Sequence, residues 1–238
     1  MKKLITLLVV LAVTTSINAQ WGKRVKGDGN MVTKTRNVSD YNRVAVGGSF
    51  DVKLIEGQEG KLTLRVDENL LQYLITEVKD GKLKIKWKKG MNISHRSDIL
   101  VTVPFKDIEE VSLAGSGDVY SEDTIKATNF KTALSGSGDI KLMVNATDVN
   151  AALSGSGDIS IEGKTGTLKC AISGSGNISA YELISNEADA RIAGSGNIKL
   201  NVKDNLKARI SGSGNIHYKG DPKRQDTKVS GSGNVSSH

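Results

Sequence analysis

Carboxylates are the side chains of this chain that recur at a regular spacing and could take part in chemistry. Asp118, Asp139 and Asp158 each follow a Gly-Ser-Gly tripeptide, and the next four copies hold an amide at this position: Asn177, Asn197, Asn215 and Asn234. If the copies stack as strands, neighbouring carboxylates lie about 4.8 Å apart, and the three together could bind a cation such as Ca²⁺. The alternative is that these side chains point into solvent or accept backbone N–H groups at the bend.

A row of lysines is the second candidate site. The row contains Lys82, Lys84, Lys86, Lys88 and Lys89. Leu83, Ile85 and Trp87 alternate with its members, and this period of two indicates a strand with lysines on its outer face. Such a face could bind an acidic polysaccharide or an anionic membrane. The alternatives are a solvated strand face and protection of a sheet edge against aggregation.

No residues with a pattern typical of catalysis, cofactor binding or metal binding stand out. His95, His217 and His238 share no ligand-like spacing. A serine occurs in every Gly-Ser-Gly tripeptide, whereas a catalytic serine is normally unique and paired with a base. The tripeptide is not followed by Gly-Lys-Ser/Thr, so it lacks the context of a phosphate-binding loop. We therefore expect a protein that is not an enzyme and has no cofactor.

Cys170 is the only cysteine, so the chain has no internal disulfide. The equivalent positions of other copies hold small residues: Thr132, Ala151, Ala190 and Ala208. We therefore predict that Cys170 is a small, buried core residue rather than a reactive thiol.

The repeat around the tripeptide predicts how these residues are positioned. Its copies begin at Gly115, Gly136, Gly155, Gly174, Gly194, Gly212 and Gly231, at steps of 18 to 21 residues. An aliphatic residue lies two positions before each copy, and Val or Ile follows each one. A fixed period near 20 is typical of a solenoid. The prediction is an all-β, right-handed parallel β-helix with about 19–20 residues per coil and a Gly-Ser-Gly-Asp/Asn corner in each coil.

Alternation within a copy predicts two strands per coil. Leu206, Ala208 and Ile210 share one parity before a corner, and Ile216 continues it afterwards. A second corner is expected at 145–148, 162–166 and 203–205, where polar residues and glycine interrupt the pattern. Glycine suits the Gly-Ser-Gly corner because a side chain there would collide with the next coil.

The remaining segments complete the predicted organisation. Residues 1–19 resemble a signal peptide, with Lys2 and Lys3 before an apolar stretch too short to span a bilayer. Residues 20–40 are expected to form a polar, poorly ordered leader. We interpret residues 41–110 as irregular first coils with insertions, in which 44–52 is a degenerate copy of the repeat, and residues 111–238 as the regular coils.

Four segments carry a family resemblance. They are a Gly-Gly-x-x-Asp-Val opening at 47–52, Glu-Asn-Leu-Leu at 68–71, Val-x-Asp-Gly-x-Leu-x-Ile at 78–85 and the serial Gly-Ser-Gly-Asp/Asn motifs. Together they resemble the head GIN domain family, described as "putative auto-transporter adhesins", over roughly residues 41–238. The resemblance implies a β-helical fold and a location in the envelope or at the cell surface, with no catalytic residues to transfer.

The sequence thus predicts an exported, non-enzymatic adhesin or recognition module of the periplasm, the outer membrane surface or the extracellular space. Its partner would be a surface glycan or another envelope component. A carbohydrate-active β-helix enzyme and a purely structural envelope scaffold are the alternatives. The formal net charge is +7, but aromatic residues make up only 4% of the chain, and without a nucleic-acid motif we expect no nucleic-acid partner. No transmembrane span is expected in the mature chain.

Overall fold

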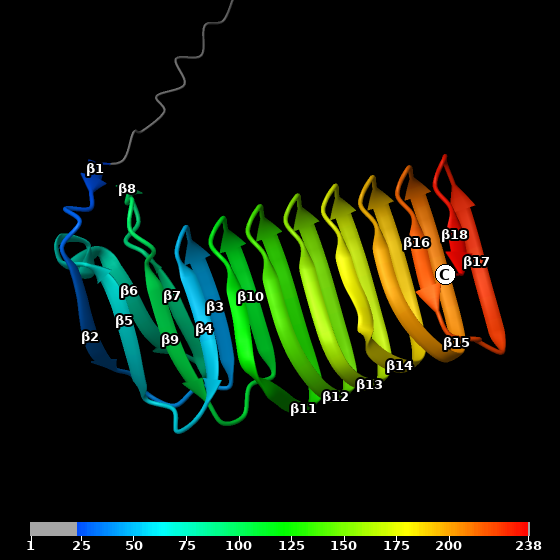
Figure 1. Ribbon diagram of the computed structural model, residues 1–238, viewed down its shortest axis with the longest axis horizontal. Helices are drawn as coiled ribbons and strands as arrows, with labels where there is room; N and C mark the ends of the chain where they lie inside the picture. Colours follow the sequence, from blue (N-terminus) through cyan, green and yellow to red (C-terminus); the bar gives the residue numbers. More distant parts are fainter. Residues whose placement is uncertain (1–22, 238) are drawn as a thin grey trace, which may run out of the picture.

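The computed structural model describes residues 23–237 and is nearly all β, with 72% strand and 3% helix. Its parallel coils stack into a β-solenoid of about 7 turns (Figure 1). This confirms the predicted β-helix. The expected signal peptide, residues 1–19, lies outside the described residues, as does His238.

The regular coils follow the repeat seen in the sequence. Their strands are β10 (Glu110–Gly115), β11 (Val119–Gly136), β12 (Ile140–Gly155), β13 (Ile159–Gly174), β14 (Ile178–Gly194), β15 (Ile198–Gly212), β16 (Ile216–Lys219), β17 (Arg224–Ser230) and β18 (Val235–Ser237). The first half of each long strand leaves a Gly-Ser-Gly corner and the second half leads into the next one. The halves form two parallel sheets, which we call the outgoing sheet and the incoming sheet.

The two edges of the solenoid differ. Gly-Ser-Gly corners form one edge and appear as a row of thin loops beyond the arrowheads (Figure 1). At the other edge, the expected second corners at 145–148, 162–166 and 203–205 lie inside β12, β13 and β15. The chain bends there without leaving the strand, because pairing with neighbouring coils continues through most of the bend.

Close stacking explains both glycines of the corner. A Cβ on Gly136 would lie 2.2 Å from the carbonyl oxygen of Gly115, and its φ is +143°. A Cβ on Gly138 would lie 1.9 Å from the carbonyl oxygen of Gly117. The backbone N–H groups of Ser137 and Gly138 donate to the Gly115 oxygen at 3.0 and 3.2 Å. The serine between the glycines is exposed, so its side chain is not restricted in this way.

The core lies between the two sheets and runs the length of the stack. Leu142 and Val144 of the outgoing sheet and Ala151 and Leu153 of the incoming sheet are buried, as are their counterparts in neighbouring coils. Cys170 belongs to this core, with 3% of its surface exposed, and its burial raises the pKa of its thiol to about 12. The predicted burial of Cys170 is confirmed.

The first coils are present but are not stacked in chain order. They use β3 (Arg43–Gly48), β4 (Asp51–Glu56), β5 (Lys61–Asp67), the 3₁₀ helix η1 (Glu68–Tyr73), β6 (Leu74–Lys79), β7 (Lys82–Trp87), β8 (Met91–Ser94) and β9 (Leu100–Phe105). Strand β3 lies between β7 and β10, and β4 lies between β9 and β11. The coil of β7 and β9 therefore stacks outside the coil of β3 and β4, although it comes later in the chain.

The expectation of a poorly ordered leader is wrong for residues 23–37. Strand β1 (Lys23–Lys26) pairs with β8, and β2 (Met31–Asn37) pairs antiparallel with β5. Arg36 also donates hydrogen bonds to the carbonyl oxygen of Leu71 at 3.1 Å and to Thr76 Oγ1 at 3.2 Å. Backbone pairing and the contacts of the half-buried Arg36 guanidinium hold this segment, and neither produces an apolar pattern in the sequence.

Candidate functional site

The outer face of the incoming sheet carries charged side chains that the strand register aligns across the coils. Strand register places outward residues of successive coils beside one another in columns, and three of these run side by side toward the Gly-Ser-Gly corners. A fourth column lies on the side of the second corners and comprises Asn129, Asp148, Thr167, Glu187, Asn205 and Arg224. We call the first of the three the charged column: Lys82, Arg43, Glu110, Lys131, Asn150, Lys169, Asp189, Lys207 and Asp226. A basic side chain recurs in every second coil from Arg43 to Lys207, at a spacing of about 9.6 Å.

The other two of the three columns form a strip of small residues in the middle of the stack. This small-residue strip comprises Ala45, Ser112, Ala133, Ala152 and Ala171, and beside them Gly47, Ala114, Ser135, Ser154 and Ser173. The strip lies in a shallow groove. Lys84 and Lys86 continue its two columns at the N-terminal end, and Arg191 continues one at the C-terminal end. The strip is therefore bordered by cations at both ends and by the charged column along one side.

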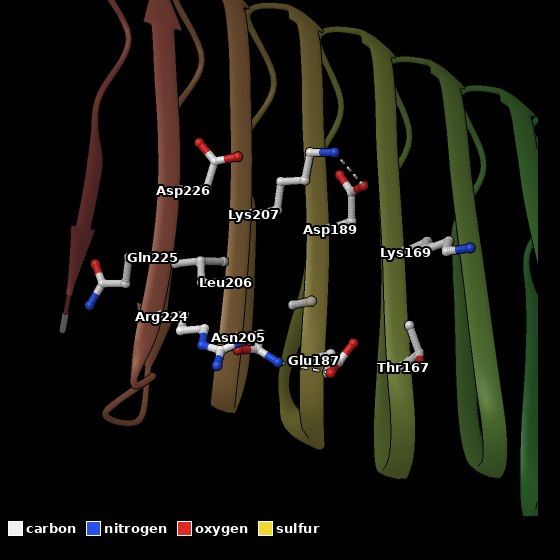
Figure 2. A pocket seen from close by; sticks show the side chains of 11 residues that line it. Thr167, Lys169, Glu187, Asp189, Asn205, Leu206, Lys207, Arg224, Gln225 and Asp226 are labelled. Atoms are coloured by element: carbon white, nitrogen blue, oxygen red, sulfur yellow. Dashed lines mark hydrogen bonds and ion pairs between the residues drawn. The ribbon is translucent and has the colours of Figure 1, made fainter.

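A polar pocket lies over the C-terminal coils of the same face, between β13 and β17 (Figure 2). Figure 2 shows Lys169, Asp189, Lys207 and Asp226 in a row across successive strands. Lys207 Nζ lies 3.8 Å from Asp189 Oδ2. The pocket thus presents both signs of charge on a surface built by the repeat.

Arginines from the neighbouring column bind two of the three carboxylates of this pocket, those of Asp189 and Asp226, whereas Glu187 accepts a hydrogen bond from Asn205. Arg191 donates to Asp189 Oδ1 at 3.0 Å and to Oδ2 at 2.8 Å, and these hydrogen bonds lower the pKa of Asp189. Arg209 donates to the carboxylate of Asp226 and lowers the pKa of that group in the same way. Both carboxylates are therefore ionised partners of arginines rather than general acids of raised pKa.

The lysine row is part of this face, but it does not protect an edge. Strand β7 lies between β3 and β6 inside the incoming sheet, so the interpretation as edge protection is wrong. Lys82 pairs with Glu110 at 2.7 Å and Lys86 with Glu77 at 3.2 Å. Lys84 makes no ion pair with any described residue. Lys88 and Lys89 lie beyond the end of the strand.

The aspartate column is a hydrogen-bonded ladder. Asp118 Oδ1 accepts the N–H of Asp139 at 2.9 Å, and Asp139 Oδ1 accepts that of Asp158 at 2.9 Å. The asparagines continue the pattern and add a hydrogen bond between their side-chain amides, since Asn197 Nδ2 donates to Asn177 Oδ1 at 2.9 Å. Within residues 23–237, no group of three or more His, Cys, Asp or Glu is arranged to hold a metal ion. The interpretation as backbone acceptors is confirmed.

The ladder has one rung that sequence reasoning missed. Asp51 Oδ1 accepts the N–H of Asp118 at 3.0 Å. The signal was available, because 44–52 resembles the repeat and Asp51 stands where the later copies have Asp or Asn.

The structure also distinguishes one corner serine from the others. Ser49 Oγ lies 3.2 Å from His95 Nε2, which is also 3.0 Å from the carbonyl oxygen of Ser49. His95 Nδ1 lies 2.9 Å from the carbonyl oxygen of Ser97. His217 contacts Ser236 Oγ at the other end of the stack. The contacts to His95 tie the first corner to the loop that covers it.

The comparisons with known proteins agree with the architecture. Residues 40–222 match the family model described as "Putative auto-transporter adhesin, head GIN domain". The chain belongs to this family. No curated protein matches it at a significant level. No helix among the described residues has the length and apolar character needed to cross a membrane.

Solved structures of related proteins share the fold. A "putative adhesin" from Bacteroides fragilis is 22% identical with a TM-score of 0.84, over 90% of this chain and 100% of the other. A "putative lipid binding protein" from Parabacteroides distasonis is 30% identical with a TM-score of 0.78, over 91% and 100%. A "putative adhesin" from Parabacteroides distasonis is 27% identical with a TM-score of 0.73, over 91% and 100%. The first likeness shows the fold; the family description and the 27% identical "putative adhesin" support an adhesin-like surface protein.

Proposed function

We propose that this head GIN domain protein is an exported, non-enzymatic adhesin that recognises a surface component through the outer face of its incoming sheet. The observation that carries the proposal is the charged column, which aligns exposed and half-buried polar side chains over many coils of one sheet. A solenoid presents such extended binding surfaces because each coil adds one position at a fixed spacing. Its family and its structural neighbours support the adhesin function.

Binding without turnover is the test of this function. The protein from residue 20 onwards is applied to a glycan array and to intact bacterial and host cells, and bound sugars are then analysed for cleavage. We expect saturable binding and intact sugars. Release of shortened or unsaturated products would support the carbohydrate-active enzyme instead, and absence of binding to every glycan and cell would favour a structural scaffold.

Export is tested separately. Fractionation of the producing cells should place the protein in the envelope or the medium, and mass spectrometry should find a mature chain that begins near Gln20. A chain that keeps residues 1–19 and remains with the cytoplasmic fraction would contradict the proposed location.

A further inference from the structure

We infer that the ligand of the incoming sheet is an extended anionic polysaccharide that lies along the stack, over the charged column and the small-residue strip. The inference rests on the proposed recognition function and specifies the class of its ligand. Its three elements are the excess of positive charge on this face, the spacing of the cations, and the shape of the floor between them.

The positive charge on this face is in excess. The three columns contain ten basic residues, namely Lys82, Arg43, Lys131, Lys169, Lys207, Lys84, Arg191, Arg209, Lys228 and Lys86. Their acidic residues are Glu110, Asp189 and Asp226, each already paired with a cation. The neighbouring column adds the acids Asp148 and Glu187 and the base Arg224, and Glu77 of β6 pairs with Lys86, so the cations still outnumber the acids on this face. Lys131 and Lys169 are exposed and make no ion pair with any described residue. Such a face attracts a polyanion.

The spacing of the cations matches a linear polymer. Arg43, Lys131, Lys169 and Lys207 are each separated by two coils, or about 9.6 Å. This is close to the length of a disaccharide unit in an extended polysaccharide. One carboxylate or sulfate facing the sheet per disaccharide would therefore meet one cation of the column. A polymer with one acid on each sugar meets this condition when successive sugars turn to opposite sides of the extended chain, and the match would extend over several units.

The floor favours a sugar chain over a membrane. The small side chains of the strip let one face of a pyranose ring approach the sheet, and the strip's own Ser135, Ser154 and Ser173 supply hydroxyl groups as hydrogen-bonding partners. The only large apolar side chain that is exposed among the described residues is Val229. The face therefore lacks the apolar side chains with which a peripheral protein enters the bilayer interface.

The test uses oligogalacturonates of graded length as the anionic probe and dextran oligomers of equal length as the neutral control. Binding to the protein from residue 20 onwards is measured by calorimetry at two salt concentrations. We expect affinity for the oligogalacturonates to rise with length, to fall as salt screens the charges, and to exceed that for dextran.

Two double variants with the same change in net charge locate the site. Lys131→Glu with Lys169→Glu reverses two cations of the charged column, whereas Lys141→Glu with Lys199→Glu reverses two exposed lysines of the outgoing sheet. The first pair should lower the affinity roughly tenfold or more, and the second should leave it within about twofold. Circular dichroism checks that both variants keep the fold.

Each other outcome overturns the inference. Equal losses of affinity in the two double variants would mean that only the net charge of the protein matters. Absence of oligogalacturonate binding would exclude an anionic polysaccharide as the ligand. Binding to phosphatidylglycerol vesicles but not to oligogalacturonate would assign the face to an anionic membrane. A neutral glycan bound on the array, with oligogalacturonate unbound, would refute this inference and leave the proposed adhesin function intact.

Discussion

At the scale of the residue, the position after each corner has one structural task that both aspartate and asparagine perform. Its Oδ1 accepts the backbone N–H of the same position in the next coil, from Asp51 at one end to Asn215 at the other. An amide adds a donor, as Asn177 Nδ2 does to Asp158 Oδ1 at 2.9 Å. Consecutive aspartates instead place like charges one coil apart, where they repel. Asparagine therefore stabilises the stack more than aspartate does at this position.

Asp139, the middle of the three aspartates in the regular coils, tests this argument. Asp139→Asn keeps the acceptor and removes repulsion, so it should raise the melting temperature, more at low salt than at high salt. Asp139→Ala removes the acceptor and should lower the free energy of unfolding by roughly 0.5–1.5 kcal/mol. Asp148→Asn, outside the ladder, is the control. Equal destabilisation by Asn and Ala, or a melting temperature that rises with Ca²⁺, would contradict the backbone-acceptor role.

Cys170 gives a prediction with a definite pH dependence. Burial raises the pKa of its thiol from the model-compound value of 9.0 to about 12, so the unfolded chain loses its proton first as pH rises. The contribution of the protonated, buried thiol to the free energy of unfolding is fully present below pH 9. It is lost as pH rises from 9 to 12, by at most about 1.4 kcal/mol per pH unit.

Urea unfolding at pH 8 and pH 10.5 measures this loss. Cys170→Ala introduces the residue that the neighbouring coils already have, so the variant should fold. Its free energy of unfolding should be about 1 kcal/mol lower than that of the wild type at pH 8, and it should decrease less than that of the wild type between pH 8 and pH 10.5. A thiol reagent should label native protein slowly and unfolded protein rapidly. Rapid labelling of the native protein would contradict the buried position.

At the scale of the element, the regular coils could be predicted because every local signal agrees there. The aliphatic alternation, the corner glycines and the ladder position recur in each copy, and each has the same physical cause in each coil. The first coils could not be ordered from the sequence. Apolar alternation specifies which face of β3 or β7 is buried, but the two strands carry no signal for which one lies further from β10.

The candidate face was only partly predictable for a similar reason. The lysines of β7 are visible as a row because they lie along one strand. Arg43, Lys131, Lys169 and Lys207 lie on four strands far apart in the chain, and only the register brings them into one column. The contact between Ser49 and His95 also joins two corners 46 residues apart in the chain, and only the stacking of their coils brings them together.

Two deletions test the coil as the structural unit. Deletion of Ala208 shifts part of β15 by one residue and turns its apolar side chains outward. Deletion of residues 155–173 removes one coil and joins Ser154 to Gly174, which then takes the register position of Gly155. We expect the single deletion to abolish cooperative unfolding or lower the melting temperature far more than the long one. Similar losses from the two deletions would contradict the stacked-coil description.

At the scale of the whole molecule, the two ends of the described stack are closed differently. Strands β2, β5 and β6 add antiparallel pairs at the N-terminal end. At the C-terminal end, every residue of β17 is exposed, and its backbone is available to a further strand on the side away from β15. Gln225 and Thr227 stand in register with the buried Leu206 and Ala208, and Tyr218 donates to Gln225 Oε1 at 3.0 Å. Polar residues thus end two of the three inward rows of this strand, whereas Val229 continues the row of Ile210 and is exposed.

This polar closure should keep the protein from stacking end to end, because an open parallel edge with an apolar column is a template for association. Gln225→Leu with Thr227→Val extends the column by one coil and exposes it. We expect this variant to self-associate with rising concentration, measured by sedimentation velocity, while the wild type does not change. Lys228→Leu adds an apolar side chain on the outer side of the same strand and should behave as the wild type, since it does not continue the core. If the double variant sediments as the wild type does at every concentration, backbone twist or the charges of β17 close this end, and Gln225 and Thr227 do not.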